Sequence, residues 1–205
     1  MKTTKLLLAA VALATALLSA TAKAQSLTAY FIEITPGQPV YGTVDGNFYQ
    51  DWASGVASFD GFDAFCVEPG QPLSYGETVI YQYQDASTLV NSATVAKLIG
   101  GFLASDMSPA QAAAVQWAIW ETVTETTNPP SLFDGNVKIT GADDVDIATI
   151  ANQYLLDVDT FTPVTLTYLS NDTRQDVVTW QVVPEPATAG LAALSALMLI
   201  RRRRR

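Results

Sequence analysis

A predicted helix around residues 115–121 (VQWAIWE) constrains the fold of this chain more than any other segment. Ser108 is placed to cap the helix, Pro109 suits its first turn, and Gln111 follows three residues after the cap, as in a capping box. At about 100° per residue, apolar side chains that include two tryptophans share one broad face. The pattern predicts a helix over 108–124 whose apolar face packs against a core.

Gln116 lies near the middle of that apolar face. A buried primary amide costs roughly 1–3 kcal/mol unless its hydrogen bonds are satisfied. One interpretation is an ordinary core glutamine with satisfied hydrogen bonds. The single cysteine of the chain, Cys66, allows another. A thiolate that adds to a carboxamide carbon expels ammonia and leaves a thioester, and this requires Cys66 and Gln116 to be neighbours in space.

A thioester must be shielded from water, and the same helix offers large apolar side chains for this. We expect Trp117, Ile119 and Trp120 to shield the bond. Glu68 and Glu121 are both candidates for proton transfer, and nothing in the sequence selects between them. We expect no metal and no cofactor.

Composition excludes several kinds of chemistry. The chain has no histidine, which removes Ser-His-Asp and Cys-His catalysis and histidine-ligated zinc. A cysteine hydrolase would lack its base. One cysteine cannot form an internal disulfide. Between residues 25 and 183, three basic residues face nineteen acidic ones, a formal charge of −16, which argues against nucleic acid and anionic membranes as partners.

Both ends of the chain resemble targeting segments. Residues 1–24 have the charged start, apolar core and Ala-Lys-Ala site of a signal peptide. At the other end, Val183-Pro184-Glu185-Pro186 leads into an apolar run (187–200) and five arginines. The run makes about 21 Å of helix, short for a hydrocarbon core of roughly 30 Å, and a marginal transmembrane anchor that stays in place is one interpretation.

Motif, apolar run and arginine cluster together resemble the PEP-CTERM sorting signal of Gram-negative bacteria, which is thought to be read by exosortase, a membrane-embedded processing enzyme. The resemblance implies an exported protein that is anchored transiently in the inner membrane through its C-terminal helix. It is then released to the cell surface or extracellular matrix. The residues between the two signals, 25–182, form the folded domain.

The order of predicted elements is strands, then helices, then strands, which indicates an α+β domain. Strands are expected at 28–35, 39–44, 48–52, 56–59, 62–67 and 77–84, with a short one at 136–140. Helices are expected at 88–103, 108–124 and 143–156. A C-terminal hairpin (163–169 with 175–182) closes the β-rich domain, and a detached anchor helix follows it.

Two further residue sets each leave two interpretations open. Asp143, Asp144 and Asp146 suit a helix N-terminus better than a calcium site, because they lack EF-hand spacing. Aromatic residues cluster in the first strands and indicate either a core or a carbohydrate-binding platform; they are Tyr30, Phe31, Tyr41, Phe48, Tyr49, Trp52 and Phe59.

The segment Phe65-Cys66-Val67, followed on the predicted helix by Val115-Gln116-Trp117-Ala118-Ile119-Trp120, resembles the Cys-Gln thioester domain of bacterial surface adhesins. That family has an aromatic-Cys-Val segment and a Thr-Gln-x-Ala-Ile-Trp helix; here Val115 holds the threonine position. The resemblance covers roughly residues 62–180, where the strand beginning at Gln175 fits the family's last hairpin loosely.

The resemblance implies a covalent adhesin whose Cys66–Gln116 thioester captures amines or hydroxyls on a surface or exopolysaccharide target. Such a protein is a single-turnover acyl donor and not an enzyme. The alternative is a non-covalent structural protein of the polysaccharide matrix, in which Cys66 is a free buried thiol.

Overall fold

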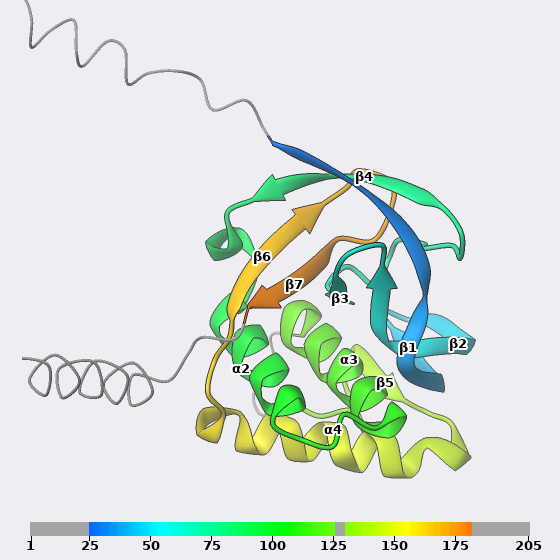
Figure 1. Ribbon diagram of the computed structural model, residues 1–205. Coiled ribbons are helices and arrows are strands. Elements are labelled where there is room, and N and C mark those ends of the chain that lie inside the picture. The colour runs from blue at the N-terminus through cyan, green and yellow to red at the C-terminus, as the bar shows by residue number, and fades with distance from the viewer. Residues whose placement is uncertain (1–24, 126–129, 182–205) are drawn as a thin grey trace, which may run out of the picture.

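The computed structural model describes residues 25–125 and 130–181 (Figure 1). The predicted signal peptide (1–24), the sorting motif (183–186) and the detached C-terminal helix lie outside the described residues. Within the described ranges, no helix has the length and apolar character needed to cross a bilayer.

The described strands form one antiparallel sheet in the order β2-β3-β7-β6-β4-β1-β5, and β1 also pairs with β2. The strands are β1 (Ser26–Val44), β2 (Asn47–Phe59), β3 (Asp63–Cys66), β4 (Thr78–Gln84), β5 (Val137–Ile139), β6 (Thr165–Ser170) and β7 (Val177–Gln181). The first part of β1 (26–30) pairs with β4, and the remainder, from Phe31 on, pairs with β2. Six strands therefore form a closed circuit of pairings, and β5 adds to the end of β1.

Three helices pack on one side of these strands (Figure 1). They are α2 (Ser92–Leu103), α3 (Pro109–Thr124) and α4 (Val145–Asp157), with short 3₁₀ turns at Ala86–Thr88, Ala142–Asp144 and Val158–Thr160. The predicted α+β class, with a β-rich N-terminal part, three central helices and a C-terminal hairpin of β6 and β7, is confirmed.

Several predicted boundaries were wrong. Pro36-Gly37 does not end the first strand, because β1 continues through a register shift between Ile34 and Gly37 that absorbs the irregular residues. The two strands expected at 48–52 and 56–59 are likewise one strand, β2. The helix expected from residue 88 starts at Ser92, after a 3₁₀ turn, and the last helix starts at Val145.

Helix α3 is the central element of the core. Every residue from Ala112 to Thr122 is buried, as expected for a helix enclosed on all sides. The Ser108 side chain caps the helix by accepting from the Gln111 N–H (3.4 Å). The return bond of a capping box is not needed, because the Ser108 N–H donates to Asp106 (3.0 Å). Packing from all sides, rather than one amphipathic face, holds Gln116 in place.

The aromatic residues of the first strands divide between core and surface. Phe31, Tyr49 and Phe59 are buried, and the rings of Phe31 and Phe59 lie 5.4 Å apart. Tyr30 and Phe48 are exposed. The core interpretation thus holds for part of the set, and the side chain of Trp52 lies outside the described residues.

The acid cluster lies at the start of α4. Asp144 is the N-cap residue of α4, and its Oδ2 accepts from the Tyr41 N–H (2.8 Å). Asp143 lies in the 3₁₀ turn Ala142–Asp144 and Asp146 in the first turn of α4, and both are exposed. Across the described residues there is no group of three or more histidine, cysteine or acidic side chains that could hold a metal ion.

Candidate functional site

Cys66 ends β3 at a place where the sheet opens. On one side β3 pairs with β7, with Cys66 opposite Val177. The Val67 N–H donates to Asp176 on that side (2.8 Å), so in an antiparallel ladder the Cys66 N–H and C=O point the other way. On that other side β2 pairs only with Asp63 and Ala64. The polar main-chain groups of Cys66 therefore have no strand partner.

The side-chain amide of Gln116 takes the place of the missing strand. The Cys66 N–H donates to Gln116 Oε1 (3.0 Å), and Gln116 Nε2 donates to the Cys66 carbonyl (2.8 Å). Cys66 is 5% exposed and Gln116 2%. The structure brings together the two residues that the sequence singled out, and both ends of the buried amide are satisfied.

A cavity of about 430 Å³ lies beside this pair, and both Cys66 and Gln116 line it. Its other lining residues are Phe31, Ile34, Pro39, Ala53, Ser54, Gly55, Pro72, Leu73, Ser74, Tyr75, Trp120 and Gln175. They come from β1, β2, α3, the segment after β3 and the segment before β7. The volume falls within the range of small-molecule sites.

Of the three residues expected to shield the bond, Trp120 alone lines this cavity. Trp117 is fully buried elsewhere in the core, where its indole N–H donates to Ser54 Oγ (3.1 Å) and its ring packs against Gly42. Ile119 is also fully buried and does not line the cavity. Trp117 and Ile119 therefore fix the position of α3, and Trp120 forms part of the wall.

Neither candidate for proton transfer lines the cavity. Glu68 accepts from Gln71 Nε2 (2.9 Å) and borders a second cavity beside Tyr168 and Asp176. Glu121 is 1% exposed, and its Oε1 accepts from the Ser131 N–H (2.8 Å). The structure thus places Glu121 against the loop after α3 and not against Cys66.

Sequence reasoning missed two polar side chains near the pair. Gln175 is 5% exposed and lines the cavity, and its Oε1 has no hydrogen-bond partner within the described residues. Tyr81 is fully buried with its hydroxyl unpartnered among those same residues. Burial raises the pKa of Tyr81, and the nearby Cys66, Glu77 and Asp176 raise it further. The alternation of Val79 and Tyr81 in β4 was the available signal for a buried tyrosine.

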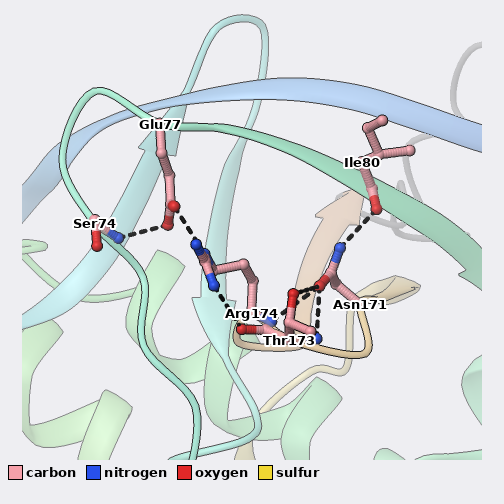
Figure 2. Close-up of polar contacts among 6 residues, drawn as sticks. All are labelled: Ser74, Glu77, Ile80, Asn171, Thr173 and Arg174. Carbon is pink, nitrogen blue, oxygen red and sulfur yellow. Dashed lines mark hydrogen bonds and ion pairs between the residues drawn. The ribbon is translucent and has the colours of Figure 1, made fainter.

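A polar network fixes two walls of the cavity relative to each other (Figure 2). Arg174 Nε donates to Glu77 Oε2 (2.7 Å), and Glu77 Oε1 accepts from the Ser74 N–H (2.7 Å). Asn171 Nδ2 donates to the carbonyl of Ile80 (2.8 Å) on β4, the strand that begins directly after Glu77. The loop that carries Ser74 and Tyr75 is therefore tied to the turn that precedes Gln175.

Burial raises the pKa of the Cys66 thiol to about 12. The charged thiolate is disfavoured because burial removes most of its solvation, and no basic side chain is among the described residues that line the cavity. A neutral form of the sulfur, either a thiol or a thioester, is the stable state in this environment.

Comparison of the chain with protein-family models, with curated proteins and with solved structures finds no match.

Proposed function

We propose that this is an exported surface protein in which Cys66 and Gln116 form an internal thioester that covalently captures a nucleophile on a surface or matrix target. The observation that carries the proposal is the reciprocal pair of hydrogen bonds between the Gln116 amide and the Cys66 main chain. These bonds hold the amide group beside the chain's one cysteine, with a cavity alongside.

The bond would form by attack of Cys66 Sγ on Gln116 Cδ. The carbon–nitrogen bond breaks, and the nitrogen takes the thiol proton and leaves as ammonia. The Cys66 N–H already donates to Oε1, which is the atom that becomes negative in the tetrahedral intermediate. A backbone donor preorganised at that position stabilises the intermediate as an oxyanion hole does.

Opening of the bond would use the same donor. A nucleophile in the cavity attacks Cδ, the carbon–sulfur bond breaks, and the proton of the nucleophile ends on Cys66 Sγ. Each molecule reacts once, so the protein acts as an acyl donor and not as a turnover catalyst. The lysines Lys97 and Lys138 are not among the lining residues, so neither is positioned to consume the bond from within.

The proposed location follows from the two ends of the chain. Export by the signal peptide, transient anchoring in the inner membrane and processing by an exosortase-type enzyme would deliver the domain to the cell surface or extracellular matrix of a Gram-negative bacterium. The strongly acidic body supports a partner other than nucleic acid.

A non-covalent matrix protein is the second candidate, and one observation favours it. Both ends of the Gln116 amide are satisfied by Cys66, as in an ordinary buried glutamine. In that case Cys66 stays a free thiol and the domain binds its matrix without a bond.

Intact mass of the purified protein decides between the two. The thioester form lacks the mass of one ammonia relative to its sequence, whereas Cys66→Ala and Gln116→Ala should each have the full mass of their own sequences. Methylamine should add to the wild type and release one free thiol, and neither variant should react. Gln111→Ala is the matched control, because it removes a glutamine from the same helix away from Cys66. A wild type of full mass that gains neither amine nor thiol would establish the non-covalent protein instead.

A further inference from the structure

The cavity beside Cys66 and Gln116 carries no charge. None of the described residues that line it is acidic or basic, although the body of the protein has a formal charge of −16. Its polar groups are amides and hydroxyls, from Gln116, Gln175, Ser54, Ser74 and Tyr75. No carboxylate of this acidic protein is therefore among the described residues that line the cavity.

An uncharged cavity disfavours a lysine side chain as the nucleophile. An ammonium group that enters it loses hydration and finds no carboxylate partner among the lining residues, which is unfavourable. It must also lose a proton before it attacks, and the lining residues include no carboxylate to accept one. A hydroxyl is neutral at every physiological pH, so it enters the cavity without the loss of an ion's hydration, and its one proton passes to Cys66 Sγ as the carbon–sulfur bond breaks.

Aromatic rings line one part of the cavity and extend to its exposed rim. Tyr75 is 61% exposed and its ring stacks on Phe31, with centroids 5.3 Å apart and planes 18° apart. Trp120 contributes a third ring to the lining. Flat apolar rings next to amide and hydroxyl groups suit a sugar, whose ring has an apolar C–H face and a polar edge.

Gln175 contributes a buried amide to the wall of the cavity. Its Oε1 is buried and lacks a partner among the described residues, so a hydrogen-bond donor that reached it would be favoured. The same side chain lines the cavity with Cys66 and Gln116. A hydroxyl that donates to Gln175 Oε1 has its oxygen lone pairs free for the Gln116 carbonyl carbon.

We propose that the thioester captures a carbohydrate hydroxyl, held by Tyr75 and oriented by Gln175, and this inference rests on the proposed function. The sugar oxygen attacks Cδ of Gln116 and the carbon–sulfur bond breaks. The hydroxyl proton passes to Cys66 Sγ, and the products are an ester and a free thiol. Water is also a neutral hydroxyl compound, so the sugar prevails only because the aromatic rim holds it in place.

The test compares two small probes on the purified full-length protein at pH 7. The first is methyl glucoside, a neutral sugar, and the second is N-acetyl-lysine amide, an ammonium compound of similar size. Methyl glucoside should add to the wild type as an ester that hydroxylamine releases, and it should add faster than the lysine compound. Faster labelling by the lysine compound, or hydrolysis without any sugar adduct, would overturn the inference.

Two variants assign the roles. Gln175→Leu should slow ester formation about tenfold, the effect of one buried hydrogen bond. Tyr75→Ala, at a position that is 61% exposed, should slow the sugar reaction. Sugar labelling that is unaltered in both variants contradicts the assignment.

The ammonia loss is measured first in every sample. A wild type without that loss refutes the proposed function, and with it this inference. A wild type with the loss that prefers the lysine compound refutes the inference alone.

Discussion

Replacement of Glu121 by glutamine should remove a pH dependence from the stability of this fold. The carboxyl group is 1% exposed on α3, with Oε1 bonded to the Ser131 N–H and Oε2 unpartnered within the described residues. Burial raises the pKa of Glu121 to about 7 from an ordinary 4.5, the Ser131 hydrogen bond opposes this, and the charges of Glu125 and Asp134 add to it. The native protein therefore holds a proton on Glu121 that the unfolded chain has lost.

The sign and size of the effect follow from this shift. A raised pKa in the folded state means that stability is fully present below the unfolded value and is lost as pH rises through the folded value. At 1.36 kcal/mol per pKa unit, the free energy of unfolding of the wild type should fall by about 3 kcal/mol between pH 4.5 and 7 on account of this group. Glu121→Gln stays neutral and lacks this loss.

Urea unfolding at pH 5, 6, 7 and 8, followed by tryptophan fluorescence, measures the difference between wild type and variant at each pH. The difference cancels the other carboxylates, which titrate alike in both proteins. Glu33→Gln makes the same chemical change at an exposed strand position and is the matched control. A flat difference for Glu121→Gln would refute the reasoning.

Because Glu121 does not line the cavity, thioester mass and amine capture should be unaltered in Glu121→Gln. Loss of either would restore Glu121 as a proton-transfer group.

Two further substitutions test the packing around the site. Gly100→Ala places a Cβ 1.9 Å from the Thr162 carbonyl and should cost about 1–3 kcal/mol in the free energy of unfolding; Gly70→Ala, with open space around it, should be neutral in the same urea titration. Ser54→Ala leaves the buried Trp117 indole N–H without its acceptor and should cost about 1–3 kcal/mol; an unchanged midpoint would show that the hydrogen bond contributes nothing.

The sequence was informative about elements and less so about where strands end. The helix over Pro109–Thr124 was predicted to within one residue, because cap, proline and periodicity agree. The first long strand was divided in two because Pro36-Gly37 is typical of a turn when the strands around it are unknown, and the second was divided at residues 53–55. Only pairing with β2 shows that β1 accommodates these residues through a register shift.

The site was predictable to the extent that it depends on rare residues. One cysteine, and one amide on an apolar face, suffice to select Cys66 and Gln116. Gln175 has no such signal, since a glutamine in a loop before a strand is ordinary, and only tertiary contacts show it buried in the cavity wall. The roles given to Trp117 and Ile119 depended on which side of α3 faces the cavity, and a helix buried all round does not reveal that side in its sequence.

The hydrogen bonds of Gln116 do not by themselves distinguish a reactive pair from a structural one, because either needs the amide to be satisfied. The surroundings of the pair favour the proposed reactive pair over a structural one. A core selected for stability alone is close-packed and leaves few voids beside a buried amide. It also leaves few buried acceptors without donors. Here Cys66 lines a cavity of about 430 Å³, and Gln175, which also lines it, is one of seven described residues with a buried side-chain polar atom that lacks a hydrogen-bond partner. A site that must admit a ligand to a protected bond needs that space and that acceptor, whereas a purely structural contact between β3 and α3 needs neither.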